Sequence, residues 1–267
     1  IDEPFIPADG IMRIAAHESR PRTFTDWNDG SVINEHEPEN RETKLDIYNP
    51  DNPNQPAYSQ EFVDTYRKAQ IERNRRITSW VQQKLSDFKK NNEKEREFGF
   101  VVHRTMADPK WLDPAIDPNG RKPNWCFLGD PKVVNNSPIG LARYCSLRSW
   151  MSQWSYDYAK GDGINCAKNI SVPTLVIGNT ADDGITPSHT HNLYNAVGNE
   201  NKDLKFYSHY PNVGVKVINK VRGLLMDHGL LSDTTKRKKE LLDQSIAAMF
   251  GDEHESPEPD NIRLVFI

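Results

Sequence analysis

The chain has 267 residues, of which 36% are hydrophobic and 27% are charged, with a formal net charge of −4 and a mean hydropathy of −0.76. This length fits one large domain or a domain with an insertion, and the low hydrophobic content indicates either much surface or surface that a partner covers. No basic face dominates, which argues against a nucleic-acid partner, and no apolar run approaches the roughly 18 residues that a membrane span needs.

Three cysteines, Cys126, Cys145 and Cys166, bear on the redox compartment. Their number is odd and no pair has C-x-x-C spacing, which argues against a disulfide framework and against a zinc knuckle. We therefore expect a reducing, cytoplasmic environment. The first residue is Ile rather than Met, which suggests processing or a partial chain.

The first third of the chain predicts one short strand and one long helix. Residues 10–17 are mostly apolar with polar flanks, as in a strand, and residues 18–58 form a long polar excursion. A helix is expected over residues 59–90, because apolar side chains recur there at helical intervals. Ser59 is a good N-cap for it, and Glu61 lies in the first turn, where the helix dipole favours an acid.

The middle of the chain predicts loops around a second helix. Residues 98–103 have the character of a strand or an extended segment, and the prolines of residues 104–140 require loops and short turns. We expect a helix over residues 146–160.

An aromatic stripe marks that second helix. Trp150, Trp154 and Tyr158 follow one another at four-residue spacing, which places them on one helix face. They could line an apolar substrate pocket, although stripes of this kind are more often core packing. Both interpretations stay open at this point.

The most informative pattern follows in residues 172–209. An apolar run over residues 172–177 is followed by Asp182 and Asp183, as expected of a buried parallel strand that carries an acid at its carboxyl end. A helix over about 188–197 and a second strand over 203–208 come next, and His209 follows that strand directly. The order strand, acid, helix, strand, His is that of the back half of a nucleophile–His–acid triad.

The C-terminal part predicts two helices and a tail. Apolar spacing predicts helices over residues 217–229 and 234–250. Residues 251–261 are acidic and contain prolines, which indicates a solvated tail, whereas residues 262–267 are apolar enough to dock on the protein.

The acid-bearing segment resembles the α/β-hydrolase superfamily. Residues 172–178 are similar to its V-P-x-L-x-[IV]-x-G strand, and the acid turn of that superfamily has its catalytic Asp four residues before a Pro. Counting back from Pro187 selects Asp183 and leaves Asp182 as a turn or capping residue. The resemblance implies the C-terminal part of an α/β-hydrolase fold, with the late strands of a parallel sheet and a large, mostly helical cap insertion.

The resemblance also suggests a domain organisation and covers about residues 8–231. Residues 1–19 would hold a core strand, residues 20–165 the cap, residues 166–231 the core with the acid turn, the His turn and the closing helix, and residues 232–267 a C-terminal helix and acidic tail.

The resemblance assigns roles to two residues. Asp183 would accept a hydrogen bond from the catalytic His and stabilise the imidazolium, and His209 would be that general base. The simpler alternatives are a helix N-cap for Asp183 and an ordinary loop histidine for His209. Trp150, Trp154 and Tyr158 would be substrate-binding residues under the cap.

No metal or cofactor is expected. His189 and His191 lie near Asp182 and Asp183, but a His-x-His pair at the start of a helix points its rings in different directions. Rossmann glycines and a P-loop are both absent from the sequence.

The nucleophile is missing from this sequence, because no G-x-S-x-G pattern occurs in it. We therefore expect a heteromeric hydrolase of a carboxylic ester or related small acyl substrate, in which a second polypeptide supplies the nucleophile elbow and the early strands. Two alternatives remain: a non-catalytic interaction protein derived from this fold, and a fragment of a one-chain enzyme. If the protein is the heteromeric hydrolase, the strand at 10–17 should pair with the strand at 172–177 on one side and with a strand from a different polypeptide segment on the other.

Overall fold

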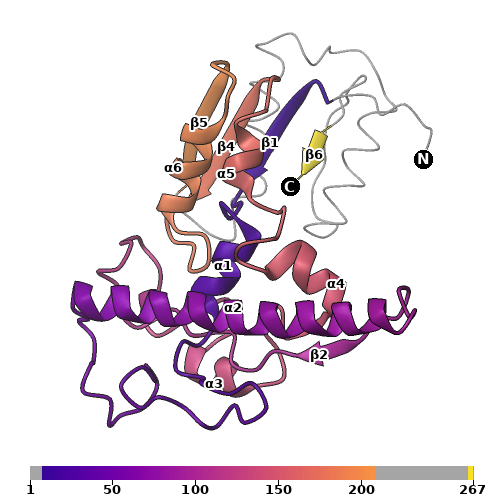
Figure 1. Cartoon of the computed structure of the whole chain (residues 1–267). Helices are drawn as coiled ribbons and strands as arrows, with labels where there is room; N and C mark the ends of the chain where they lie inside the picture. Colours follow the sequence, from indigo (N-terminus) through magenta and orange to yellow (C-terminus); the bar gives the residue numbers. More distant parts are fainter. Residues whose placement is uncertain (1–7, 208–263, 267) are drawn as a thin grey trace, which may run out of the picture.

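A parallel β-sheet forms the upper half of the protein in Figure 1. The computed structural model describes residues 8–207 and 264–266. All neighbouring strands of this sheet are parallel, in the order β5 (Lys202–Tyr207), β4 (Thr174–Asn179), β1 (Gly10–Ile14) and β6 (Leu264–Phe266). The protein is therefore of mixed α/β class, as predicted, and its three predicted core strands are confirmed.

Strand β4 lies at the centre of the sheet, and its sequence fits that position. Val176 and Ile177 are buried, as expected of a parallel strand that is covered on both faces. Gly178 permits close packing, because a Cβ there would lie 2.5 Å from the Phe206 ring and 2.7 Å from the Thr190 hydroxyl. The glycine that breaks the apolar run thus lets the following helix and β5 approach the strand.

The expectation that a strand of another polypeptide covers the second edge of β1 is wrong. Gly10, Ile11 and Met12 pair in parallel with Leu264–Phe266 of the same chain, and not with a strand from another polypeptide segment. The apolar C-terminal residues can take this position because an open parallel edge offers unpaired N–H and C=O groups to any extended segment.

Two helices pack beside the sheet in Figure 1. Helix α6 (Pro187–Ala196) connects β4 to β5 and contacts both, which makes a parallel β–α–β unit, and each end lies within one residue of the predicted bound. Helix α5 (Gly163–Ala167) lies against α6. The predicted helices over 217–229 and 234–250, and His209, lie outside the described residues.

A 31-residue helix crosses the lower half of the protein (Figure 1). This helix, α2 (Gln60–Lys90), begins as predicted, since the Ser59 side chain accepts a hydrogen bond from the Phe62 N–H at 3.2 Å. Helix α1 (Arg20–Trp27) leads from the sheet to α2 and packs against it. Within the described part of the chain, every helix is either too short or too polar to cross a bilayer.

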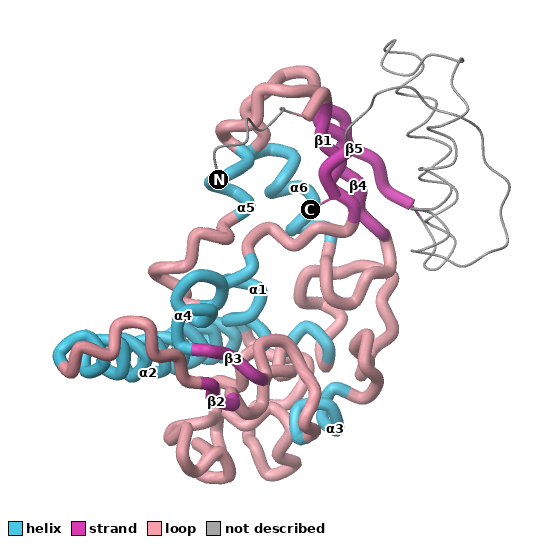
Figure 2. The backbone as a smooth tube through the Cα atoms, turned by 90° about the vertical axis from the view of Figure 1, so that its right-hand side faces the viewer, coloured by secondary structure: helices cyan, strands magenta, loops and turns pink. Residues whose placement is uncertain are grey.

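Residues 20–165 consist mostly of loops and turns, so the expectation of a mostly helical cap is wrong (Figure 2). The prolines of this segment interrupt hydrogen-bonded ladders and leave short pieces. In its described residues the strands are antiparallel, and none is parallel. The short elements are β2 (Gly99–Val101), β3 (Tyr144–Ser146), α3 (Pro131–Asn136), α4 (Leu147–Ser149), the 3₁₀-helix η1 (Pro109–Trp111) and the π-helix η2 (Trp150–Trp154).

The second predicted helix, over 146–160, is too long. Helical structure ends at Trp154, because the Asn74 side chain donates to the Trp154 carbonyl at 2.9 Å and accepts from the Tyr156 N–H at 2.9 Å. A side chain of α2 therefore replaces the backbone partners that would continue the helix.

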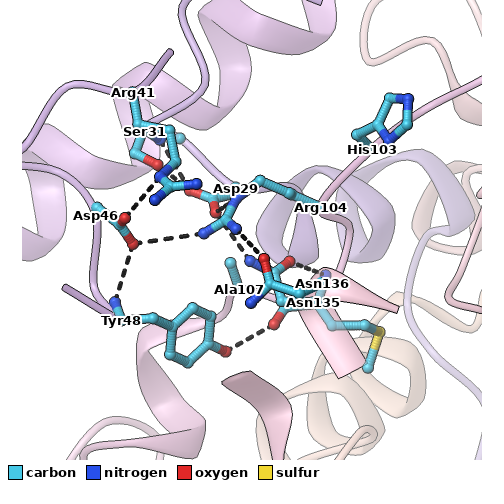
Figure 3. Close-up of polar contacts among 12 residues, drawn as sticks. Asp29, Ser31, Arg41, Asp46, Tyr48, His103, Arg104, Ala107, Asn135 and Asn136 are labelled. Carbon is cyan, nitrogen blue, oxygen red and sulfur yellow. Dashed lines mark hydrogen bonds and ion pairs between the residues drawn. The ribbon is translucent and has the colours of Figure 1, made fainter. Parts of the chain in front are cut away.

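A buried polar network holds the lower half together (Figure 3). The Asp29 carboxylate accepts from Arg104 Nε at 2.7 Å, from Asn135 Nδ2 at 2.9 Å and from the Ser31 hydroxyl at 2.6 Å. Arg73 of α2 donates to the Asp29 carbonyl at 3.0 Å. These side chains connect the loop around Asp29, the loop at Arg104 and helix α3 to the long helix α2.

Candidate active site

The turn after β4 presents the predicted acid. Asp182 folds back on this turn, since its Oδ1 accepts from the Gly184 N–H at 3.0 Å and from the Ile185 N–H at 2.8 Å. The prediction that Asp182 is the turn residue is thereby supported by geometry. The neighbouring Asp183 carboxylate takes no part in this turn, and among the described residues no side chain donates a hydrogen bond to it.

The simpler alternative for Asp183, an N-cap of α6, does not apply. The N-cap position of α6 is occupied by Thr186, and Pro187 follows at the first helical position. Thr186 makes no side-chain cap, and its buried hydroxyl has no hydrogen-bond partner among the residues that the structure describes. Ser188 donates to Asp117 Oδ2 at 2.5 Å. Asp183 therefore does not cap α6.

The environment of Asp183 favours its neutral form. Burial, and next the nearby Asp182 carboxylate, raise the pKa of Asp183 to about 6, against the opposing effects of a hydrogen bond from its own backbone N–H and of the charges on Lys110 and Arg121. A carboxyl group that titrates close to neutral pH at the carboxyl end of a parallel strand is typical of functional sites.

The ends of β4 and β5 meet at this edge of the sheet. Asn179 pairs with Tyr207, and the Thr180 N–H donates to the Tyr207 carbonyl at 2.9 Å. The start of the acid turn is thus bonded to the last residue of β5. His209, two positions further along the chain, lies outside the described residues, so its predicted contact with Asp183 stays a prediction.

Three residues that the sequence patterns did not identify donate hydrogen bonds to the backbone of the acid turn, residues 182–184. Trp111, which is fully buried, donates from Nε1 to the Asp183 carbonyl at 2.8 Å. Lys110 and Asn119 donate to the two adjoining carbonyls, of Gly184 and Asp182, at 3.0 and 2.7 Å. The only local signal for this segment is Asp108-Pro109, where Asp108 accepts from the Lys110 N–H and starts η1.

The aromatic stripe divides between core and surface. Trp150 is fully buried, donates from Nε1 to the Thr78 hydroxyl at 3.0 Å and packs edge-on against Phe24. Trp154 also packs against Phe24, whereas Tyr158 lies beyond the end of η2 and is exposed. The three residues do not share a helix face, and the structure does not bring them together with Asp183 through any hydrogen bond between described residues.

The two histidines of α6 contact different parts of the protein. His189 Nδ1 accepts from the Glu18 N–H at 3.2 Å, and the His191 ring packs on Phe206. Their rings therefore diverge, as predicted. Within the described ranges, 8–207 and 264–266, no group of three or more His, Cys, Asp or Glu side chains is arranged to hold a metal ion.

We expect His189→Asn to reduce the acid sensitivity of the fold. Burial, and next Lys110, lower the pKa of His189 to about 4, while Asp117 and Asp108 oppose and His17 adds to the lowering. The folded state thus binds fewer protons than the unfolded state, and the stability from neutral His189 is lost as pH falls from about 6.5 to 4. At roughly 1.4 kcal/mol per pKa unit, this loss is about 3 kcal/mol.

Urea unfolding at pH 7, 5 and 4 measures this difference. Asn keeps an acceptor for the Glu18 N–H but does not titrate, so the variant should lose less stability than the wild type over this range. Parallel pH profiles for the two proteins would contradict the assignment.

Comparison of the chain with protein-family models, with curated proteins and with solved structures found no match. The case for a function therefore depends on the geometry of this chain alone.

Proposed function

We propose that this chain supplies the acid and the base of an α/β-hydrolase triad that acts on a carboxylic ester. The observation that carries the proposal is the partly buried Asp183 carboxylate at the carboxyl end of β4, in the parallel order β5-β4-β1. Three features of the turn support it: Asp182 makes the turn, Thr186 takes the N-cap, and the described chain leaves the Asp183 side chain without a structural task.

In this proposal Asp183 orients His209 and stabilises the imidazolium that forms during turnover. His209 takes the proton of a serine hydroxyl on the segment that carries the nucleophile elbow, while the serine oxygen bonds to the ester carbonyl carbon. The ester C–O bond then breaks, and the alcohol leaves with the proton from His209. A water molecule, activated by His209 in the same way, hydrolyses the acyl-enzyme and restores the serine.

Position supports His209 as the base. Tyr207 is bonded to Thr180 at the start of the acid turn, and His209 follows two residues later. Two extended residues span at most roughly 7 Å, which limits how far along the chain His209 can depart from Tyr207.

The test identifies the nucleophile in the native protein. The protein is purified under native conditions, treated with a fluorophosphonate probe, which labels activated serines, and assayed with p-nitrophenyl butyrate. We expect ester hydrolysis, and a labelled serine in a G-x-S-x-G peptide of a second, stoichiometric polypeptide.

Other outcomes would change the proposal. A labelled serine in the same polypeptide, upstream of Ile1, would keep the triad but overturn the two-chain arrangement. A folded protein with neither labelling nor hydrolysis would overturn the hydrolase proposal.

One observation favours the interaction-protein alternative. Four large apolar side chains within a short stretch of sequence are between 39% and 64% exposed, which is typical of surfaces that meet a partner. They are Trp125, Phe127, Leu128 and Val133. Specific binding of a partner by the unlabelled, inactive protein would support this second function.

A further inference from the structure

Three consecutive backbone carbonyls of the acid turn each accept a side-chain hydrogen bond from residues 110–119, a loop that begins in η1. Asn119 Nδ2 donates to the Asp182 carbonyl at 2.7 Å, Trp111 Nε1 to the Asp183 carbonyl at 2.8 Å, and Lys110 Nζ to the Gly184 carbonyl at 3.0 Å. The Gly184 N–H is taken by Asp182. The backbone around Asp183 is thus held on both sides, whereas its carboxylate accepts no hydrogen bond from any other side chain that the structure describes.

The same loop contacts the strand side of the turn through its backbone. The Gly120 N–H donates to the Thr180 carbonyl at 2.8 Å, so the contact continues from the end of β4 to Gly184. Trp27 of α1 closes the remaining side, since its ring lies 3.4 Å from the point where a Cβ on Gly184 would be. The acid turn is therefore contacted by residues 110–120 and by Trp27, all of which precede β4 in the chain.

One buried arginine holds this loop in shape. The Arg121 guanidinium donates to the Lys110 carbonyl from Nε and Nη2 at 3.1 and 2.9 Å, and to the Ile116 and Asp117 carbonyls at 2.5 and 2.6 Å. It also donates to Asn119 Oδ1 at 2.9 Å. Arg121 thus fixes both ends of the stretch from Lys110 to Asn119.

We propose that Trp111 and Asn119 are positioning residues that fix the Asp183 carboxylate in a partly buried place by anchoring the carbonyls of the acid turn, with Arg121 shaping the loop that carries them. As positioning of the triad acid, this role rests on the proposed function. The anchoring itself concerns Asp183 alone and can be measured without any catalytic activity.

The physical consequence concerns solvation. Hydrogen bonds from the buried Trp111 and Lys110 and from the partly buried Asn119 keep the turn close to the loop and limit the access of water to the carboxylate. Burial and Asp182 together raise the pKa of Asp183. Without an anchor, the turn can relax toward solvent, which favours the ionised form. The charges on Lys110 and Arg121 oppose the rise, and both residues are kept in the variants chosen below. In Asn119→Ala the Arg121 guanidinium loses one acceptor, Asn119 Oδ1, but keeps its bonds to the Lys110, Ile116 and Asp117 carbonyls.

The test compares Trp111→Phe and Asn119→Ala with two matched controls. Tyr48→Phe removes a buried bond to the Met106 carbonyl of 2.7 Å, and Asn52→Ala removes one to the Asp46 carbonyl of 3.0 Å. Each control loses a side-chain bond to a backbone carbonyl away from the acid turn. Asn52→Ala also loses an acceptor oxygen, for the Asn54 N–H at 2.9 Å, just as Asn119→Ala loses the acceptor for Arg121. The pKa of Asp183 is measured by carbon NMR on aspartate-labelled full chain, with Asp183→Asn to assign the signal.

We expect the pKa of Asp183 to fall by one unit or more, from about 6 toward the ordinary aspartate value, in both test variants and to stay unchanged in both controls. An unchanged pKa in folded Trp111→Phe and Asn119→Ala would overturn the proposal. If Trp111→Phe does not fold, Asn119→Ala decides alone, since Asn119 is only partly buried.

An activity measurement separates this proposal from the proposed function. If the protein hydrolyses p-nitrophenyl butyrate, the test variants should lower kcat about tenfold with KM unchanged, and the controls should alter neither. A protein without esterase activity in which the pKa of Asp183 still falls would refute the hydrolase proposal and leave the anchoring established.

Discussion

Asp183→Asn should stabilise the fold at pH 8 and, under the proposed function, greatly slow ester hydrolysis. The pKa of Asp183 is raised to about 6, so the folded state binds a proton more tightly there than the unfolded state does. Stability from the neutral carboxyl is therefore full below about pH 4 and is lost as pH rises through 6. Because the carboxyl is only partly buried, we expect a gain of about 2 kcal/mol for the variant at pH 8 and none near pH 4. Ester hydrolysis should fall roughly 10³- to 10⁴-fold, as when a triad acid is lost.

Asp182→Asn is the matched control on the same turn. Asn keeps an oxygen acceptor for the Gly184 and Ile185 N–H groups but removes the charge that raises the pKa of Asp183. It should lower that pKa and leave most of the hydrolysis intact. Chemical unfolding at pH 4 and 8, with an ester assay, measures both variants. A stability change in Asp183→Asn that does not depend on pH would contradict the assignment.

Local sequence signals predict the elements around the site well. Ser59 starts α2 as its capping preference predicts, and Gly178 ends the apolar run of β4 where α6 and β5 approach. Counting back from Pro187 selects Asp183 rather than Asp182 as the candidate acid. In the structure the Asp182 carboxylate accepts hydrogen bonds within the turn, whereas the Asp183 carboxylate does not. In each case the relevant partners lie within a few residues along the chain or in the next strand.

Contacts between distant segments could not be predicted in this way. Trp111 is 72 residues from the carbonyl of Asp183 that it bonds, and Asn74 is 80 residues from the Trp154 carbonyl at which it ends a helix. Neither residue belongs to a periodic pattern that marks its partner. Helical spacing at Trp150 and Trp154 correctly indicates packing, but it carries no information about a side chain of α2 that stops the helix.

The edge of the sheet illustrates a different limit. An unpaired parallel edge on β1 predicts that some strand must cover it, but not which one. The C-terminal residues Leu264–Phe266 can do so because they are apolar and have free backbone groups. Pairing rules therefore predict that a strand covers this edge of β1, but which segment forms that strand depends on the fold of the whole chain.

The largest loss of stability is expected from Arg104→Met, at the centre of the network in Figure 3. Arg104 is bonded to Asp29 at 2.7 Å and lies 3.5 Å from Asp46, and the side chains of all three are at most 5% exposed. Although burial favours the protonated acid, Arg104 and the Ser31 hydroxyl hold the pKa of Asp29 below its usual value. Removing the cation leaves a buried charge without its partner, which costs about 3–5 kcal/mol.

Methionine isolates the charge in this experiment. It keeps a Cβ at a residue whose φ is +55°, so the backbone strain at position 104 is the same in both proteins, and it fills a similar length of side chain. Replacing the Arg104 guanidinium by the end of a methionine side chain leaves no large cavity. The change in the free energy of unfolding should therefore come mainly from the lost ion pair and hydrogen bonds, and not from lost volume.

A double variant and a surface control complete the test of Arg104. Arg104→Met combined with Asp29→Asn removes both charges, and part of the lost stability should return, because the penalty comes from the unpaired carboxylate. Arg75→Met breaks an ion pair with Asp157 of nearly equal length, 2.8 Å, but both side chains are exposed, and the unfolding midpoint should hardly move. If Arg104→Met itself does not fold, recovery of a folded protein by the double variant still demonstrates the coupling. A loss below about 1 kcal/mol for Arg104→Met would instead place this pair with weak surface bridges.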